Sequence, residues 1–337
     1  MKIDRRAFLS QVGRTASAAA LGSVLPSIIR PASMRDSAIV ERTVFAMGTT
    51  VSITAHGPDR ALLLSATTRA FEELTRMDRL LSVFCGSSEI SSLNHAAGRE
   101  PIRISPATAE LLRSASIFSQ LSDGSFDITV EPLMDLWGFR ERPHRRWPSD
   151  RELAEAREGL GWRRVDVSPD GWAFLTHPRT RIDVGGIGVG FTVDRMGEIL
   201  RREGVTSALI DHSGDLLAIG SPPDEDGWPV AIPDPLDPET LLVHMSLCDR
   251  AISTSSNRRT TRMLDGIMIG HIVDPRTGKN PEGPLSVTVV APTSTEADAL
   301  STTLFVEGPH DTKWRNGQRE SIVVVDAGRE RRVHRIR

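Results

Sequence analysis

The sequence predicts an α+β fold, in which mixed and largely antiparallel sheets are covered by helices. β-rich runs recur along the chain, and longer segments place apolar residues three and four positions apart, as one face of a helix requires. Strands and helices are interleaved without the regular strand–helix–strand alternation that builds a parallel sheet. These observations favour antiparallel strand pairing over a parallel α/β arrangement.

The first predicted elements are a hairpin and two helices. Residues 43–55 hold two β-rich runs around Met47-Gly48-Thr49, where Gly48 supplies the backbone freedom of a tight turn. Residues 59–81 repeat apolar side chains at helical spacing. Ser105-Pro106, a cap residue followed by proline at the first helical position, begins a second helix that ends near Leu121.

The rest of the chain mixes loops, strands and helices. A charged loop with two prolines is expected at residues 140–150. Strands are expected at residues 181–184, 207–211, 216–220, 228–232, 286–291 and 321–326. Helices are expected at residues 191–203 and 294–305, the first of them after a glycine-rich turn at residues 185–190.

Composition excludes several classes of protein. The 337 residues are 39% hydrophobic and 25% charged, which is typical of a folded globular chain. A net charge of only -3 lacks the basic surface that nucleic-acid binding needs, so no nucleic-acid partner is expected. Cys85 and Cys248 have no metal-ligand spacing, which argues against a thiolate metal site and favours two idle thiols; one disulfide between them stays open.

The N-terminal segment predicts export. Arg5-Arg6 and the following Phe8-Leu9 precede a weakly apolar, small-residue stretch at residues 16–25, the pattern of a twin-arginine signal. That stretch is shorter than the ~20 residues that span a bilayer, so no stable membrane anchor is expected. We therefore expect a signal peptide at residues 1–33 and a periplasmic product.

The glycine-rich turn is a candidate anion site. Glycines between a strand and a helix allow backbone N–H groups to face an anion at the helix N-terminus. Gly186 and Gly188 match the first half of the dinucleotide-binding GxGxxG pattern, but Phe191 stands where the third glycine belongs. Taken alone, the segment is equally compatible with a tight structural turn.

Asp298 and Thr302 are a candidate metal pair. They lie four residues apart in an expected helix and therefore share one face. Two such oxygens suit Mg²⁺, a hard cation that keeps several waters and is completed by substrate phosphates. Spacing alone favours a simpler alternative, in which Thr302 bonds back to the carbonyl four residues earlier and Asp298 lies favourably near the helix N-terminus.

Four further features have a structural interpretation, and two of them, His271 and Phe84, also have a chemical one. His271 is either an incidental histidine beside a surface turn or a general base. Asp127 and the Leu-Trp-Gly-Phe run at residues 136–139 are compatible with a strand edge and an aromatic core. Phe84 is compatible with core packing, although an aromatic face also stacks on planar ring systems.

Taken together and in this order, these segments resemble the ApbE family of FAD:protein FMN transferases from Met47 to about Asp326. The order and breadth of the set make the resemblance specific, since no single segment would suffice. The segments that carry it are residues 47–49, 81–84, 88–94, 126–130, 136–139, 182–186, 271–278 and 297–302.

The resemblance implies an ApbE, T-fold-like architecture, with FAD in a cleft between two lobes that form one functional unit over residues 40–337. It places Phe84 where the family often has a tyrosine that stacks on the isoalloxazine, and it assigns proton removal from the acceptor to His271. It implies that the Gly186 carbonyl, Asp298 and Thr302 bind magnesium. The remaining residues that it places at the FAD site are Met47, Ser125, Phe126, Asp127, Asp183, Val189 and Ile272.

Three positions depart from the family pattern. Val189 stands where many members carry a lysine next to the flavin nucleotide, Ser213-Gly214 replaces a common Gly-Gly, and Ser255-Ser256 stands where Ser-Gly is usual. The sequence has no tyrosine, so the stacking ring is expected to be Phe84. Loss of the lysine charge is expected to weaken nucleotide binding or alter turnover.

The activity implied by the resemblance is magnesium-dependent transfer of FMN from FAD to a threonine or serine hydroxyl of another protein, with release of AMP. The implied acceptor is an exported or membrane redox subunit with a short Ser/Thr-rich flavinylation motif. Two alternatives remain open at this point: hydrolysis of FAD to FMN and AMP in the same fold, and a periplasmic flavin-binding protein without catalysis, which Val189 in place of the common lysine leaves open.

Overall fold

The computed structural model describes residues 3–4, 38–140, 146–257, 260–308, 320–327 and 330–336. The predicted export signal at residues 1–33 lies outside the described residues, apart from the two-residue strand β1 (Ile3–Asp4). Part of the expected loop at residues 140–150 also lies outside them, and helix α6 (Asp150–Arg157) begins where that loop ends.

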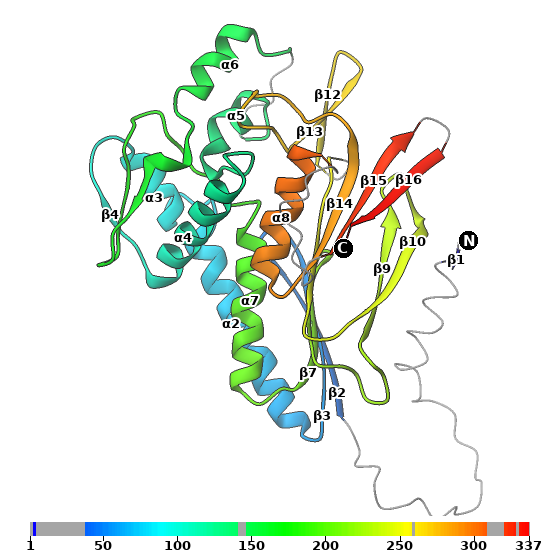
Figure 1. Ribbon diagram of the computed structural model, residues 1–337. Coiled ribbons are helices and arrows are strands. Elements are labelled where there is room, and N and C mark those ends of the chain that lie inside the picture. Colours follow the sequence, from blue (N-terminus) through cyan, green and yellow to red (C-terminus); the bar gives the residue numbers. More distant parts are fainter. Residues whose placement is uncertain are drawn as a thin grey trace, which may run out of the picture.

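An eight-stranded sheet forms the centre of the fold (Figure 1). Its strand order is β16-β15-β14-β11-β8-β7-β3-β2, and every neighbouring pair is antiparallel, as predicted. The strands are β2 (Ala38–Ala46), β3 (Thr49–Gly57), β7 (Ser207–His212), β8 (Asp215–Ile219), β11 (Ala251–Ser255), β14 (Pro284–Ala291), β15 (Glu320–Ala327) and β16 (Glu330–Ile336).

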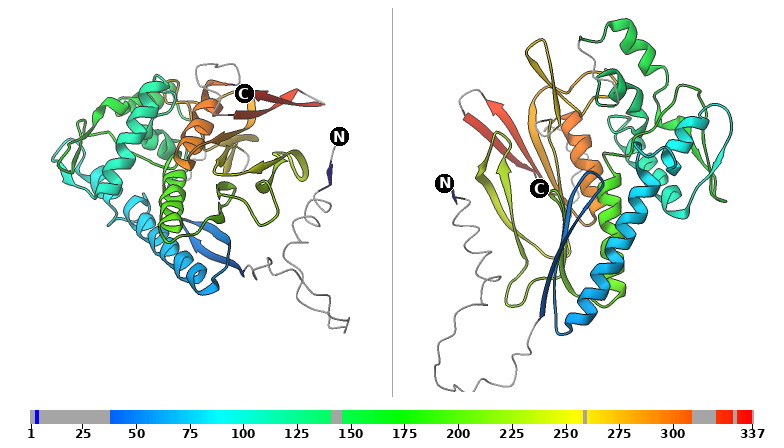
Figure 2. Two further views of the ribbon diagram at one scale, coloured as in Figure 1. Left: turned by 60° about the horizontal axis from the view of Figure 1, so that its bottom comes forward. Right: turned by 180° about the vertical axis from the view of Figure 1, so that it is seen from behind.

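Three helices cover one face of this sheet (Figures 1 and 2). They are α2 (Arg60–Leu81), α7 (Gly188–Arg202) and α8 (Ser294–Glu307). Their apolar faces and the sheet share the largest core, with Ile53, Leu74 and Leu200 among its fully buried members. Burial of such side chains from water is the main source of stability for the fold.

A second, smaller sheet packs on the opposite face. β9 (Trp228–Asp234) and β10 (Asp237–Leu247) pair with each other, and β1 pairs with β10. Trp228 and Val230 of β9 pack against Ile252 and Val290 of the main sheet. The main sheet is therefore buried on both faces in this region.

Apart from the hairpin at residues 261–270, the remaining elements lie beyond α7 and α8, on the side away from the main sheet (Figure 1). Four helices and two 3₁₀ turns belong to this part: α3 (Glu89–Ala96), α4 (Pro106–Leu121), α5 (Glu131–Leu136), α6, η1 (Ile128–Val130) and η2 (Trp162–Arg164). A small sheet joins β4 (Ile102–Arg103), β6 (Trp172–Leu175) and β5 (Val165–Val167), and a separate hairpin is formed by β12 (Thr261–Leu264) and β13 (Ile267–Gly270).

Most predicted elements are confirmed, with boundaries set by local capping. Met47 and Gly48 both have positive φ, 49° and 77°, which makes the tight turn between β2 and β3. Asp59 caps α2 by accepting from the Ala61 N–H at 2.8 Å, and Ser105 caps α4.

The prediction of a strand at residues 181–184 is wrong. The backbone N–H and C=O of Ile182 bond to the side-chain amide of Asn94, at 2.7 and 2.9 Å, and the Asp183 N–H donates to the Ile128 carbonyl at 2.7 Å. Because a side chain and a 3₁₀ turn satisfy this extended backbone, no neighbouring strand is needed. The helix that follows also begins at Gly188 rather than at 191, since the last glycines of the turn enter its first turn.

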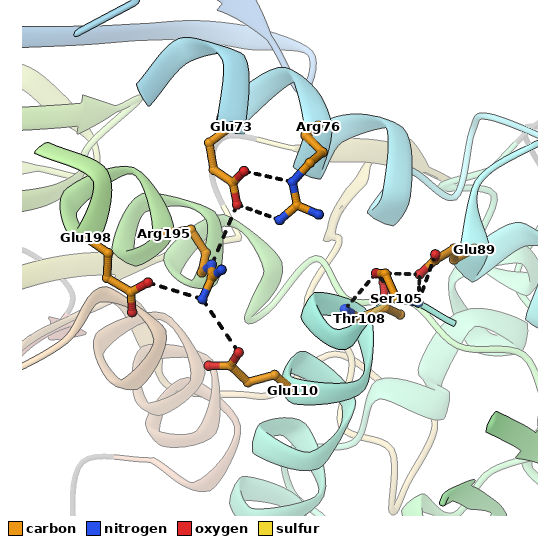
Figure 3. A network of polar contacts seen from close by, with 8 residues as sticks. All are labelled: Glu73, Arg76, Glu89, Ser105, Thr108, Glu110, Arg195 and Glu198. Carbon is orange, nitrogen blue, oxygen red and sulfur yellow. Dashed lines mark hydrogen bonds and ion pairs between the residues drawn. The ribbon is translucent and has the colours of Figure 1, made fainter. Parts of the chain in front are cut away.

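Arg195 of α7 joins three helices through charged contacts (Figure 3). Its guanidinium lies 3.6 Å from Glu73 of α2, 3.7 Å from Glu110 of α4 and 3.1 Å from Glu198 of α7. Glu89 of α3 separately accepts from the Ser105 N–H at 3.0 Å, as Figure 3 also shows. Pairs that keep this much contact with water contribute at most about 1 kcal/mol each, so they orient the helices that the apolar cores stabilise.

Two remaining sequence expectations concern cysteines and the membrane. Cys85 and Cys248 are both free thiols, so the disulfide left open by the sequence is not formed. Across the part of the chain that the structure describes, no helix combines the length and the apolar character needed to cross a bilayer.

The packing of α7 on α8 depends on Gly190. A Cβ at this position would lie 2.2 Å from the Ser294 carbonyl oxygen and 2.8 Å from Cβ of Asp298. Neither contact is sterically allowed, so the two helices approach this closely only because residue 190 has no side chain.

We therefore expect Gly190→Ala to lower the free energy of unfolding by about 2–3 kcal/mol, because the added methyl forces α7 and α8 apart. Gly86→Ala is the matched control, since a Cβ at Gly86 meets nothing within 4 Å. Urea unfolding followed by circular dichroism measures both variants. Equal midpoints for the two would mean that α7 and α8 do not pack in the way described.

Candidate functional site

A cavity of about 820 Å³ is lined by residues of α7 and α8 and by residues of the segment 125–140, which belongs to the part of the fold beyond these helices. Its size suits a cofactor-sized ligand. All twelve side chains or backbone positions singled out from the sequence line it, although they come from segments far apart in the chain. They are Met47, Phe84, Ser125, Phe126, Asp127, Asp183, Gly186, Val189, His271, Ile272, Asp298 and Thr302.

The glycine turn and α8 meet inside the cavity. Asp183 Oδ1 accepts from the Gly185 N–H at 2.7 Å, which shapes the turn. A Cβ on Gly186 would lie 3.2 Å from Thr302 Oγ1, so this glycine backbone lies directly against the threonine hydroxyl. The turn therefore lies against the face of α8 that carries Thr302.

Asp298 is a buried carboxylate on that face. Its Oδ2 accepts from the Gly190 N–H at 2.9 Å, and the side chain is 6% exposed. Burial raises the pKa of Asp298 well above its usual range, and the charge of Asp215 raises it further. An ionised Asp298 therefore requires a compensating positive charge in the cavity.

Thr302 does not make the backbone contact that its spacing favoured. Its Oγ1 lies 3.1 Å from Ser255 Oγ, whereas the Asp298 carbonyl accepts from Ser301 Oγ at 3.0 Å. Ser255 Oγ also lies 2.8 Å from Ser301 Oγ. Ser255, at the end of β11, therefore contacts the hydroxyl groups of both Ser301 and Thr302. The Thr302 hydroxyl thus remains at the cavity wall.

These donors suit a hard cation. Among the described residues, no group of three or more His, Cys, Asp or Glu side chains is placed to hold a metal ion. The protein would instead contribute one carboxylate, one hydroxyl and one carbonyl, from Asp298, Thr302 and Gly186, and leave the remaining positions to water and substrate. This all-oxygen, incomplete set fits Mg²⁺ rather than a nitrogen- or sulfur-bound metal.

The start of α8 is held by Asp194 of α7. Its two carboxylate oxygens accept from the N–H groups of Ser294 and Thr295, each at 2.8 Å, and from Thr295 Oγ1 at 2.6 Å. A carboxylate at a helix N-terminus satisfies free N–H groups and interacts favourably with the helix dipole. Partial burial nevertheless raises the pKa of Asp194.

His271 reaches the cavity from the end of β13. Its backbone N–H donates to the Thr260 carbonyl at 3.2 Å, and the ring packs edge-on to Phe139 with centroids 6.5 Å apart. Nδ1 is buried without a hydrogen-bond partner. Burial lowers the pKa of His271, and the charge of Arg140 lowers it further, so the ring is a neutral base at pH 7.

Other lining residues have protein partners that fix the cavity wall. The Met47 N–H donates to Asp78 Oδ2 at 3.2 Å, and Ser125 Oγ donates to Glu307 Oε1 at 2.7 Å. The Ile272 N–H donates to Asn257 Oδ1 at 2.7 Å. These backbones are thus positioned before any ligand binds.

Asp127 differs from the strand edge considered from the sequence, because it caps η1. Oδ1 accepts from the Thr129 N–H and hydroxyl, and Oδ2 from the Trp162 N–H at 2.9 Å. Burial raises its pKa, although each of these bonds opposes that effect. Both oxygens are therefore already engaged in holding the cavity loops together.

Three charged residues without a predicted site role also line the cavity: Asp78, Arg140 and Asp215. Arg140 directly follows the Leu-Trp-Gly-Phe run, and Asp215 is the first residue of β8, directly after the turn that joins β7 and β8. No local sequence pattern distinguishes these three residues, and only the tertiary structure brings them to the same cavity as Asp298 and His271.

Comparison with known proteins gives one consistent result. The model of the ApbE family matches residues 47–324. An FAD:protein FMN transferase of Salmonella typhimurium is 34% identical over 78% of this chain and 77% of its own length, and one of Escherichia coli K12 is 32% identical over 72% and 70%. The crystal structure of the ApbE protein of Thermotoga maritima covers 88% of this chain and 97% of its own with a TM-score of 0.79 and 27% identity. The flavin transferase ApbE of Vibrio cholerae covers 89% and 97%, with a TM-score of 0.78 and 27% identity.

Asp194→Ala removes the three bonds that hold the start of α8, and we expect it to lower the free energy of unfolding by about 2–4 kcal/mol. Asp59→Ala removes a more exposed helix cap and should lower it by only about 1 kcal/mol. Denaturant titration compares the two. If Asp194→Ala lowers stability no more than Asp59→Ala, the buried cap is not what holds α8.

Proposed function

The chain belongs to the ApbE family and is a flavin transferase, and we propose that it transfers FMN from FAD to a threonine or serine hydroxyl of another protein, in a magnesium-dependent reaction that releases AMP. The observation that carries this proposal is the meeting of Gly186, Asp298 and Thr302 in a cavity of about 820 Å³. An incomplete oxygen site of this kind suits a phosphoryl-transfer reaction, in which substrate phosphates complete the metal coordination.

In this proposal the pyrophosphate of FAD lies at the glycine turn. Backbone N–H groups at the start of α7 offer hydrogen bonds to phosphate oxygens, and the helix dipole favours negative charge there. Asp298, Thr302 and the Gly186 carbonyl would hold Mg²⁺ against the same phosphates. When bound, the ion supplies positive charge that stabilises the charge developing on the transferred phosphoryl group.

Phe84 is the proposed platform for the isoalloxazine. Its side chain is 76% exposed and lines the cavity, so one face of the ring is accessible to a planar ligand. Stacking on an aromatic side chain needs no hydroxyl, so phenylalanine can replace a tyrosine in this role. Val189 lines the cavity in the first turn of α7 and offers packing without charge.

His271 is the proposed general base. In the reaction the hydroxyl oxygen of the acceptor bonds to the phosphorus of the FMN half, the bond from that phosphorus to the AMP oxygen breaks, and AMP leaves. The hydroxyl proton passes to the neutral imidazole of His271, which lines the cavity. The other residues of the cavity position the reactants and exclude water, which is the main contribution of proteins to this chemistry.

The transferase activity implies a protein acceptor. We propose an exported or membrane redox subunit with a Ser/Thr-rich flavinylation motif, because Arg5-Arg6 and the apolar stretch at residues 16–25 favour export through the twin-arginine route to the periplasm.

Incubation of the purified protein with FAD, Mg²⁺ and a candidate acceptor domain tests the proposed reaction. Flavin fluorescence that remains on the denatured acceptor, with one AMP released per flavin attached, is the expected result. AMP release without a labelled acceptor would indicate FAD hydrolysis instead. Bound FAD with neither product would indicate a flavin-binding protein.

Asp298→Ala should lower the rate of transfer by at least about a hundredfold, because it removes the one carboxylate of the proposed metal site. Glu296→Ala, on the same helix but outside the cavity lining, is the control and should retain activity. The wild type should also unfold at a higher temperature in Mg²⁺, and Asp298→Ala should lose this shift. A metal-dependent shift that survives in Asp298→Ala would place the ion elsewhere.

The pH dependence of transfer tests the role of His271. Its pKa is lowered from the ordinary value near 6.5, so the basic form persists below that pH and the rate should stay constant from about pH 8 to about pH 6.5. The rate should then fall as His271 takes up a proton at lower pH. His271→Asn should lower the rate about a hundredfold or more and abolish this acidic limb. An unchanged limb in the variant would assign the proton transfer to another group.

A further inference from the structure

Phe84 stands on a rigid loop but projects its ring into the cavity. Ser88 Oγ donates to the Ser82 carbonyl at 2.6 Å, and the Ser88 N–H donates to the Cys85 carbonyl at 2.9 Å, so the loop backbone is fixed. The ring itself is 76% exposed, and the guanidinium of Arg140 lies over it with Cζ 5.3 Å from the centroid. The orientation of the ring therefore depends on Arg140.

Arg140 is buried among charged partners. Its side chain is 12% exposed, it forms an ion pair with Asp183, and its Nε lies 3.9 Å from Glu131 Oε1. Nε has no hydrogen-bond partner. Among the described residues that line the cavity, Arg140 is the only lysine or arginine, whereas five aspartates line it.

Asp183 extends this contact to the glycine turn. While one of its oxygens pairs with Arg140, Oδ1 accepts from the Gly185 N–H at 2.7 Å. Gly185 precedes Gly186, whose backbone lies against Thr302. A continuous set of contacts thus runs from the Phe84 ring through Arg140 and Asp183 to the turn proposed to bind phosphate.

Arg140 and its carboxylate partners Asp183 and Glu131 are not expected to contribute much to the stability of the fold. Burial lowers the pKa of Arg140 and raises that of Glu131, so for both groups the loss of hydration outweighs their mutual attraction. Buried ion pairs of this kind are often no more stabilising than apolar side chains of similar volume. Their position beside an open cavity points to a role in ligand binding.

We propose that Arg140 is a positioning residue for the flavin: its guanidinium holds the Phe84 ring and, through Asp183, the glycine turn in a fixed relation, so that the isoalloxazine and the FMN phosphate bind together. This inference rests on the proposed function, because it assumes a flavin nucleotide in the cavity. It concerns the FMN half of FAD and leaves the AMP half unaffected. The planar guanidinium suits this task, because it stacks on an aromatic face while pairing with a carboxylate at its edge.

Equilibrium binding of FMN and of AMP to the purified full-length protein tests this inference without an acceptor. Arg140→Met should weaken FMN binding about tenfold, the scale of a partly buried cation–π contact, and change AMP binding less than about twofold. Arg140→Lys keeps the charge but loses the planar fork, and its FMN affinity should lie between those of wild type and Arg140→Met.

Arg42→Met is the matched control. The Arg42 guanidinium also lies 5.3 Å from an aromatic centroid, that of Phe71, but neither residue lines the cavity. It should bind FMN as tightly as wild type. In a Phe84→Leu background, the effect of Arg140→Met on FMN binding should shrink to about threefold or less, because the ring that Arg140 positions is gone.

Three results would overturn the inference: FMN affinity unchanged in Arg140→Met, equal losses for FMN and AMP, or the same tenfold loss with and without Phe84. Thermal unfolding identifies any variant that fails to fold, and Arg140→Lys then decides the outcome. If FMN affinity depends on Arg140 and Phe84 as expected but the wild type labels no acceptor, the proposed function fails and the inference stands. If labelling is intact and Arg140→Met binds FMN normally, the inference alone fails.

Discussion

The packing of α7 against α8 is the contact on which the functional part of this fold depends. Gly190 lets the two helices approach until its own N–H reaches the Asp298 carboxylate at 2.9 Å. One turn later Asp194 holds the first N–H groups of α8. The same interface therefore fixes the helix that carries Asp298 and Thr302 and the glycine turn that faces them.

The electrostatics of the cavity follow from that packing. Helix contact buries Asp298, and the loss of hydration raises its pKa, which repulsion from Asp215 raises further. Among the residues that the structure describes, five aspartates and one arginine line the cavity. The acidic wall near α8 is suited to a divalent cation, and Arg140 offsets the charge of Asp183 on the side of Phe84. A substrate with a planar ring at one end and a pyrophosphate beyond it matches this division.

Much of the fold could be predicted from the sequence, because its signals are local. The turn at Met47-Gly48, the cap at Ser105-Pro106 and the spacing of apolar residues in α2 each depend on neighbouring residues alone, and the structure confirms them. The prediction of a strand at residues 181–184 failed because the backbone of Ile182 bonds to the side chain of Asn94, 88 residues away in the sequence. No local pattern carries that contact.

In the candidate site, too, local patterns were not enough to assign the residues their roles. The twelve candidate residues were identified by resemblance to a family, and the structure brings all of them to one cavity. The spacing of Asp298 and Thr302 alone favoured an ordinary helix, and only the position of Ser255 shows that the threonine hydroxyl is held at the cavity wall. Arg140 escaped notice because a single arginine after an aromatic run has no local meaning. Its partners Phe84, Asp183 and Glu131 come from three separate segments.

A crystal structure of the protein with FAD and Mn²⁺, in which anomalous scattering locates the metal, tests whether α8 and the glycine turn form the metal and pyrophosphate site. We expect one metal ion about 2.0–2.3 Å from an oxygen of Asp298 and from Thr302 Oγ1, bound to the pyrophosphate, with the isoalloxazine on Phe84. A metal bound away from α8, or FAD seated with its pyrophosphate remote from Gly186, would contradict it.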